Sequence, residues 1–418
     1  MSFIINFSIF RRNRNFMYLY IGQFVSFMGT MITGVALPYQ IYTETHSTLM
    51  VGLLSLFQLL PLLVTALIGG VFADRYHRRM LLLVSELILA VGSLLLAFNA
   101  WLPVPHIWVM FVVSSLMSAF TGLHRPALES IVQQIVAKED LPVVSSLASI
   151  KGSVAMIGGP ALGGLLIASF GLVATYVIDV ASFVVSLTAL LLMHNIPKPQ
   201  NVRDDSTWVS LKQGFRYSFS RQELVGTYVV DFVAMIFGMP TALFPAIAMS
   251  FGGAKVLGML YAAPAVGALM ISFFSGWTKH IKRHGLAIAV SASLWGFAII
   301  IFGLATNFWV ALFFLALAGA FDGISGIFRM TMWNETIPNE YRGRLAGIEM
   351  ISYLSGPRLG DTEAGLVAAA FGITASIVSG GVLCVMGVGV CCLFLPKFWR
   401  YRSDIAAAPE SYQRTAEA

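Results

Sequence analysis

The sequence predicts an all-α integral membrane protein with twelve transmembrane helices in two pseudo-symmetric bundles of six. Of its 418 residues, 57% are hydrophobic and only 11% are charged, and the mean hydropathy is +0.80. A soluble domain carries roughly 25% charged residues, so much of this chain's surface must face lipid. Twelve long apolar segments, and a second half that repeats features of the first, complete the prediction.

Each apolar segment has about the 20 residues that a helix needs to cross a bilayer. Strands of a membrane barrel would instead show about ten residues of alternating polarity. The first six segments are 16–42, 49–73, 80–100, 106–135, 143–169 and 172–194, and the last six are 223–249, 256–277, 286–305, 308–335, 345–371 and 373–398. The predicted domains are an N-terminal bundle (1–196), a cytoplasmic linker (197–222), a C-terminal bundle (223–398) and a cytoplasmic tail (399–418).

Basic residues lie almost entirely on one side of the predicted helices. Of the 26 Lys and Arg residues, only Lys255 falls in a loop on the opposite side. Short cytoplasmic loops collect Lys and Arg, so we predict a multi-pass membrane protein with both termini in the cytoplasm. The same distribution explains the net charge of +6 without the continuous basic patch that nucleic acid would require.

The N-terminus lacks the order of charges found in a cleaved signal peptide. Apolar residues 3–10 precede Arg11, Arg12 and Arg14, whereas a signal peptide places its positive charge before its apolar core. We therefore expect segment 2–15 to remain on the protein as a short interfacial segment.

Motifs for enzymatic chemistry do not occur in the sequence. Cys384, Cys391 and Cys392 all fall in the last span, where neither a disulfide framework nor a metal spacing can be read. A phosphate-binding Gly-x4-Gly-Lys-Ser/Thr loop, a His/Cys cluster and a nucleophile elbow do not occur. We predict that the protein is not an enzyme, uses no cofactor or metal and is not driven by ATP.

The two halves resemble each other. Basic loops at 70–79 and 276–285 are offset by 206 positions, and Arg125 and Arg329 by 204. Offsets this similar indicate an internal repeat of about half the chain. Transporters built from such repeats place the substrate site at the repeat interface, near the membrane midplane.

The predicted linker, residues 197–222, is the one long polar stretch that interrupts the series of apolar spans. It carries Trp208, Leu211, Phe215 and Phe219 at helical spacing. This pattern predicts an amphipathic helix along the cytoplasmic membrane surface.

Two acids inside the predicted spans are candidates for proton coupling. A charge at the bilayer centre costs at least ~2.5 kcal/mol on insertion scales, so each one needs a partner or a role. Asp322 lies near mid-helix, and Arg329 follows seven residues later on the same helix face. Asp231 has no evident partner within its own helix. Because intramembrane carboxylates are the usual proton carriers, we predict this role for Asp322 or Asp231.

Other charges admit a structural interpretation. Arg125 can pair with Glu129 four residues later, and Arg358 with Asp361 three residues later. Interior charges often simply pair with one another. Arg125 and Arg329 are also candidates for a substrate cavity, where they would attract an anionic ligand or tune the acids. Glu86, Lys151 and Asp179 have no evident partner within their own helices.

The first span has no charge but carries a polar stripe. Gln23, Ser26, Thr30, Thr33 and Gln40 follow one another in steps of 3, 4, 3 and 7 and so share one face. A stripe of amides and hydroxyls is not expected to face lipid. This face either lines a cavity or bonds to a neighbouring helix, and Gln23, Ser26 and Thr30 are the candidates for the cavity.

The fifth span contains a run of small residues, Gly158, Gly159, Pro160, Gly163 and Gly164. Small residues let helices approach closely, and proline removes a backbone donor and kinks the helix. The run predicts tight packing, a bendable contact between moving bundles, or both.

The loop 70–79, which begins at Gly70 and reads GVFADRYHRR, resembles the signature G-x-L-A-D-R-x-G-R-R/K of the major facilitator superfamily. Phe72 replaces Leu and His77 replaces the second Gly. The run at 158–164 is similar to the family's antiporter signature, which marks exporters more than importers. Such a resemblance implies the major facilitator fold and a rocker-switch exporter driven by proton influx.

Two further segments, 322–344 and 356–365, look like the enterobactin (siderophore) exporter branch of that family, and the resemblance covers about 16–398. It implies a protein of the bacterial inner membrane whose first, fourth, seventh and tenth helices line the cavity. The same branch holds many general drug-efflux proteins, so the substrate stays open at this point.

The resemblance also implies a conformational latch. In the family, the acid of the signature loop meets the cytoplasmic start of the eleventh helix, and an arginine of the loop pairs with an acid on the fourth helix. Carried over, Asp74 would face residues 344–348, and Arg75 or Arg78 would pair with Glu129. A carboxylate is stabilised at a helix N-terminus, so these contacts would hold the cytoplasmic side closed.

Our first hypothesis is a proton-coupled secondary transporter that exports a siderophore or similar amphipathic small molecule. The alternatives are a broad multidrug antiporter and a siderophore importer, since alternating access is reversible. A transport-inactive receptor is disfavoured because the loops are short and no soluble sensor domain is present. The expected partners are a small-molecule substrate, protons and the lipid bilayer, and nothing in the sequence indicates an oligomer, so we expect a monomer.

Overall fold

The computed structural model describes residues 8–194 and 216–403. Side chains in these ranges are described except at 70, 71, 73–75, 339–344 and 346–350. Most of the predicted linker, with its amphipathic pattern, and most of the predicted tail lie outside the described residues.

The first half consists of long helices. They are α1 (Ser8–Arg12), α2 (Arg14–Thr45), α3 (Thr48–Arg75), α4 (Arg78–Trp101), α5 (Ile107–Ile135), the 3-10 turn η1 (Lys138–Asp140) and α6 (Leu141–Leu192). The 52-residue α6 contains the fifth and sixth predicted spans, which meet at Gly171, where φ is 78°. Glycine adopts this left-handed backbone without the cost that a side chain would add, so the chain can reverse there.

The second half follows the same plan. Its elements are α8 (Gln222–Phe237), η2 (Thr241–Leu243), α9 (Phe244–Phe251), α10 (Ala254–Phe273), η3 (Ser275–His280), α11 (His284–Leu304), α12 (Phe308–Thr336), α13 (Asn339–Phe371), α14 (Ile373–Phe394) and α15 (Pro396–Trp399).

The seventh span differs from the continuous helix expected over 223–249. It breaks between α8 and α9, at Gly238 and Pro240. Proline has no backbone N–H and clashes with the preceding turn of a helix. The break leaves backbone groups without helical partners, and the indole nitrogen of Trp295 donates to the carbonyl of Gly238 at 2.9 Å. The freed carbonyl is thereby satisfied at membrane depth.

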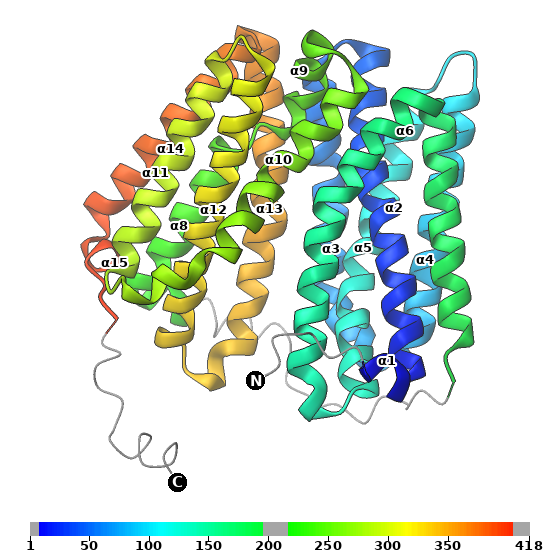
Figure 1. The fold of residues 1–418 in the computed structure, drawn as a ribbon, viewed down its shortest axis with the longest axis horizontal. Coiled ribbons are helices and arrows are strands. Elements are labelled where there is room, and N and C mark those ends of the chain that lie inside the picture. Colours follow the sequence, from blue (N-terminus) through cyan, green and yellow to red (C-terminus); the bar gives the residue numbers. More distant parts are fainter. Residues whose placement is uncertain (1–7, 195–215, 404–418) are drawn as a thin grey trace.

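The chain crosses the membrane twelve times. Among the described residues, ten segments are long and apolar enough to span a membrane. α6 reverses at Gly171 and so supplies two crossings, and the 33-residue α13 adds the last. Helices α2–α6 pack into one bundle and α8–α14 into a second (Figure 1). The predicted fold class is confirmed.

The bundles touch along two seams, α3 against α13 and α6 against α10. Both seams depend on facing glycines. A Cβ at Gly365 would come 2.9 Å from the Cα of Gly52, and a Cβ at Gly164 would come 2.7 Å from the backbone nitrogen of Gly258. Both seams lie toward the end of the molecule that holds α9, away from α1 and α15 (Figure 1). The cavity described next lies beside these seams.

Candidate functional site

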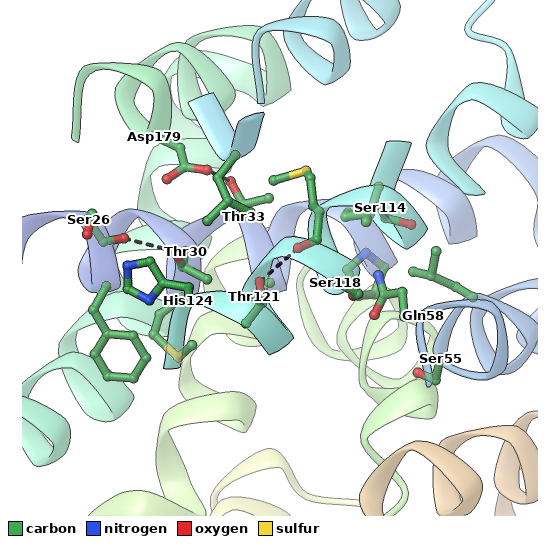
Figure 2. Close-up of a pocket in the computed structure, with 18 of the residues that line it drawn as sticks. Ser26, Thr30, Thr33, Ser55, Gln58, Ser114, Ser118, Thr121, His124 and Asp179 are labelled. Carbon is green, nitrogen blue, oxygen red and sulfur yellow. Dashed lines mark hydrogen bonds between the residues drawn. The ribbon is translucent and has the colours of Figure 1, made fainter. Parts of the chain in front are cut away.

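A cavity of about 490 Å³ lies between the two bundles. Most of its lining comes from α2, α3, α4 and α5, and the C-terminal bundle contributes Thr241, Tyr261, Arg358 and Asp361. Figure 2 shows the hydroxyl groups of Ser26, Thr30 and other polar side chains gathered around it. Ligand sites commonly measure roughly 300–1,000 Å³ and carry a few convergent polar groups on an apolar wall. The cavity matches both features.

The polar stripe of α2 lies on the cavity and also bonds to neighbouring helices, so the two alternatives for this face are not exclusive. Gln23, Ser26, Thr30 and Thr33 line the cavity. The stripe also bonds to other helices, because Thr33 donates to Asp179 at 2.6 Å and Gln40 accepts from Tyr176 at 2.8 Å. The burial of this face follows from both uses.

Glu86 of α4 is the centre of a buried cluster in the N-terminal bundle. Its side chain is 1% exposed. One carboxylate oxygen, Oε1, lies 2.7 Å from Nε2 of Gln23, 3.1 Å from Nε2 of His124 and 3.4 Å from Oγ of Ser26. Gln23, Ser26 and His124 come from α2 and α5, so three helices meet at this carboxylate.

Asp179 of α6 is a second buried acid, and its partners are neutral hydroxyls. Thr33 and Ser93 donate to Oδ2 at 2.6 and 2.7 Å, and Ser182 donates to Oδ1 at 3.2 Å. Three donors on one carboxylate compensate for much of its lost hydration. Asp179 therefore ties α2, α4 and α6 together.

Asp361 of α13 connects the two bundles. It accepts a hydrogen bond from Ser55 of α3 at 2.9 Å. It also accepts from the hydroxyl of Thr241 and from the backbone N–H of Ala242 at 2.7 Å, both at the break between α8 and α9. The first turn of a helix offers unpaired N–H groups that favour an anion. Asp361 thus holds the broken helix and the opposite bundle in place.

Arg358 lies one turn before Asp361 and bonds to the opposite bundle as well. Its Nη1 donates to Oε1 of Gln58 on α3 at 2.5 Å. Two polar contacts, Ser55–Asp361 and Gln58–Arg358, therefore cross the α3–α13 seam at the wall of the cavity.

The two predicted proton carriers meet in the C-terminal bundle. The guanidinium of Arg329 forms an ion pair with Asp231 of α8 and lies 3.6 Å from Oδ1 of Asp322, one face of α12 supplying both Arg329 and Asp322. The side chains of Arg329 and Asp231 are only 12% and 10% exposed. A separate cavity of about 130 Å³ adjoins Asp231 and Arg329.

The comparison with known proteins decides the family. The sequence profile of transmembrane secretion effectors matches residues 6–410. The chain belongs to this family. It is a major facilitator transporter and not an enzyme.

Relatives of this secretion effector match along almost their whole lengths. The chain is 28% identical over 403 residues to "Enterobactin exporter EntS" of Salmonella typhi, covering 96% of this chain and 97% of the relative. It is 29% identical over 409 residues to the protein of the same name from Shigella boydii serotype 18, covering 96% of each.

Solved structures show the same fold at low sequence identity. The nucleoside transporter NupG superposes with a TM-score of 0.73 at 14% identity, covering 90% of this chain and 98% of that structure. A POT family transporter in complex with 5-aminolevulinic acid superposes with a TM-score of 0.71 at 12% identity, covering 92% and 97%.

The small residues of the fifth span make two kinds of contact in this secretion effector, one within the N-terminal bundle and one with the C-terminal bundle. A Cβ at Gly163 would lie 3.3 Å from Cα of Ile32 in α2, so this glycine packs within the N-terminal bundle. Gly164 instead faces Gly258 across the seam, and Gly258 in turn approaches the carbonyl of Pro160. Packing within a bundle and contact between bundles therefore alternate along the run, with Gly158 and Gly159 facing methionines of α2.

Arg125 and Glu129 lie away from the lining of the main cavity. Arg125 Nε is 3.4 Å from Oε1 of Glu129, and the two side chains are 54% and 66% exposed. The Arg125 guanidinium also lies 5.7 Å from the ring centre of Tyr353 on α13. Of the predicted cavity residues, Gln23, Ser26 and Thr30 line this cavity, whereas Arg125 and Arg329 do not.

Only part of the predicted latch can be placed. The side chains of Gly70, Asp74 and Arg75, and those at 344 and 346–348, lie outside the described set. Arg78 is described, and its Nη1 donates to the carbonyl of Ser130 on α5 at 3.2 Å. The signature loop therefore contacts α5, the fourth membrane-spanning helix, through the backbone carbonyl of Ser130, which follows Glu129 in the sequence.

Sequence reasoning missed His124, Gln58 and Thr241. A lone histidine, a glutamine or a threonine in an apolar span carries no pattern, and each became visible only as a partner of Glu86, Arg358 or Asp361. The sequence Gly238-Met239-Pro240 could have signalled the break that exposes Thr241, because glycine and proline together interrupt helices. Within 8–194 and 216–403, no three His, Cys, Asp or Glu side chains are placed to share a metal ion.

Proposed function

We propose that this chain is a proton-coupled exporter of a siderophore or a similar amphipathic small molecule, acting across the bacterial inner membrane by alternating access. The observation that carries the proposal is its similarity to enterobactin exporters over 96% of the chain. The size and polarity of the cavity support it, since hydroxyl and amide groups suit a ligand rich in hydrogen-bonding groups.

Alternating access would use the two seams as a gate. The α3–α13 and α6–α10 contacts close the end of the molecule near α9. With the basic loops in the cytoplasm, this is the outer end, and the cavity would load from the cytoplasm. Separation of the seams, together with closure of the signature loop around Asp74, would then release the substrate outward. Transport unchanged by Asp74→Asn in correctly inserted protein would contradict the latch.

Proton coupling would reside at Asp231, Arg329 and Asp322. The cluster carries one net negative charge when both acids are ionised, and a single proton makes it neutral. Protonation of either acid would free part of the Arg329 guanidinium and change how α8 and α12 are held together. Since these helices belong to the same bundle, the proton would bias the shape of that bundle and not the seam directly.

The decisive experiment compares wild-type and deletion cells grown without iron, by mass spectrometry of medium and cell extract. Loss of an iron chelator from the medium, with accumulation inside, is the expected result. Accumulation in the medium would indicate import, and an unchanged medium would contradict the siderophore proposal. A fluorescent protein fused to the C-terminus tests the topology, because it fluoresces only if that end is cytoplasmic.

A second candidate, broad multidrug antiport, is favoured by the charge of the cavity. Its lining contains three acids, Glu86, Asp179 and Asp361, against one arginine, Arg358. An acidic, partly aromatic cavity suits lipophilic cations. A deletion strain that became several-fold more sensitive to cationic dyes, with unchanged chelator secretion, would select this candidate.

A further inference from the structure

Arg358 of α13 is the one arginine or lysine among the described residues that line the main cavity. The side chain is partly buried, and its Nη1 donates to Oε1 of Gln58 at 2.5 Å. The guanidinium has no second acceptor among the described side chains, and none of its nitrogens is both buried and unpartnered. Arg358 therefore presents unused N–H groups with accessible surface at the cavity wall.

A guanidinium in this position calls for an anion. Arginine carries five N–H donors and is always charged, and charges at membrane depth are normally paired with one another. Arg329 follows this rule, because it contacts Asp231 and Asp322. The direct partner of Arg358 is a neutral amide. Its charge is thus left without a counterion in contact.

Asp361, one turn later on α13, is the acid nearest in sequence, and its oxygens are taken by other donors. It interacts with Arg358 electrostatically, but the two form no ion pair in the described part of the chain. One oxygen of Asp361 accepts from Ser55, and the other accepts from the hydroxyl of Thr241 and the backbone N–H of Ala242. Asp361 holds the seam and the helix break, and it leaves the guanidinium open.

The other two acids of the lining are also directed into the protein. Asp179 accepts from three hydroxyl groups of the N-terminal bundle. One oxygen of Glu86 is contacted by amide, hydroxyl and imidazole groups, and the other is buried. A ligand in the cavity therefore meets the free donors of Arg358, although the acids outnumber it.

We propose that Arg358 is the anion-binding group of the main cavity and that it selects substrates with two adjacent acidic oxygens. The proposal rests on siderophore export as the function and names the part of the substrate that is recognised. The planar fork of a guanidinium matches such a pair of oxygens with two parallel hydrogen bonds. Catecholates, hydroxamates and carboxylates carry this pair, whereas lipophilic cations do not.

Gln58 is the positioning residue of this site. It belongs to α3 and holds the guanidinium from across the α3–α13 seam. Figure 2 shows Gln58 and Ser55 on the same side of the cavity. The bond to Gln58 fixes one edge of the guanidinium and leaves the remaining N–H groups to the ligand.

The test measures binding of two probes to the purified full-length transporter: enterobactin, and enterobactin with its catechol hydroxyls methylated, which can no longer ionise. Wild type should prefer enterobactin roughly 10- to 100-fold, as expected for charge-assisted hydrogen bonds. Arg358→Gln should lose most of this preference by binding enterobactin more weakly, with the affinity for the methylated probe within about threefold of wild type. Arg12→Gln, at an arginine whose side chain is 61% exposed, is the matched control and should keep the preference.

A second variant tests the site without removing the arginine. Gln58→Glu places a carboxylate against the guanidinium, where it pairs with Arg358 across the seam and competes with an acidic ligand. It should lower the preference for enterobactin at least several-fold while the protein stays folded. If Gln58 had a structural role alone, this stronger bond would leave the preference unchanged.

The possible failures are distinguishable. A wild-type preference in Arg358→Gln would overturn the anion site and leave siderophore export intact. If that variant does not insert, a wild-type preference in Gln58→Glu overturns the site instead. Transport of enterobactin by a wild-type protein that binds both probes equally would also overturn it. Failure of wild type to bind or transport enterobactin would overturn the proposed function itself.

Discussion

The two bundles hold their buried acids in opposite ways. In the N-terminal bundle, Glu86 is surrounded by neutral donors and a histidine and faces a cavity of about 490 Å³. In the C-terminal bundle, Asp231 and Asp322 share the guanidinium of Arg329 beside a cavity of about 130 Å³. Two halves with one architecture have therefore diverged at their charged sites.

The difference has a physical consequence. A carboxylate held by neutral donors and a histidine has no arginine or lysine to release when its surroundings change. A carboxylate paired with arginine cannot lose its charge without releasing a cation, so its protonation must move a side chain or a helix. We infer that the N-terminal bundle is suited to recognition and the C-terminal bundle to coupling, and the following predictions test that division.

Removal of Arg329 should have the largest effect. Arg329→Gln leaves two acids close together without their cation, and breaking a buried pair costs about 3–5 kcal/mol. We expect a large drop in the thermal midpoint of the purified protein, measured by size-exclusion chromatography after heating. The double variant R329Q/D231N should recover part of the loss. Full wild-type stability in the single variant would show that the cluster is not an ion pair.

Neutralisation of Asp322 should remove coupling but spare recognition. Asp322→Asn is expected to lower proton-driven transport in proteoliposomes at least tenfold, while substrate affinity stays within about threefold, because Asp322 is absent from the lining of the main cavity. Asp322→Glu is the matched control that keeps the charge. Unchanged pH-driven transport in Asp322→Asn would remove this acid from the role and leave Asp231 as the candidate.

The seam between the bundles should tolerate no side chain at Gly365. A Cβ there would come 2.6 Å from the carbonyl oxygen of Thr48, and overpacking of this kind costs about 1–3 kcal/mol. Gly365→Val should hold the seam apart, which fluorescence transfer between dyes placed on the two bundles would detect, and should slow transport. Gly389→Ala in α14, which meets nothing within 4 Å, should behave as wild type.

Loss of Arg125 should have the smallest effect on stability. Its pair with Glu129 is more than half exposed, and pairs of this type contribute about 0.2–1 kcal/mol. Chemical denaturation of Arg125→Gln should show a change in the free energy of unfolding within this range. Loss of transport at unchanged stability would instead show that Arg125 acts on the substrate, as predicted for a candidate cavity residue.

Much of the architecture was predictable from local patterns. The length of the apolar segments determined the crossings, and a helical period of 3.6 residues placed the polar stripe of α2 on one buried face. Asp322 and Arg329 could be matched in advance for the same reason, since both stand on one helix. These features depend on residues close together in sequence, where the geometry of the helix is already known.

The tertiary structure decided every contact that crosses from one helix to another. It brought Asp231 to Arg329, His124 to Glu86, and Asp361 to the break at Pro240. A sequence pattern defines which face of a helix is polar, but the rotation and tilt of neighbouring helices determine what that face meets. Those are set by close packing, such as that of Gly52 against Gly365, and packing of this kind depends on all the helices together.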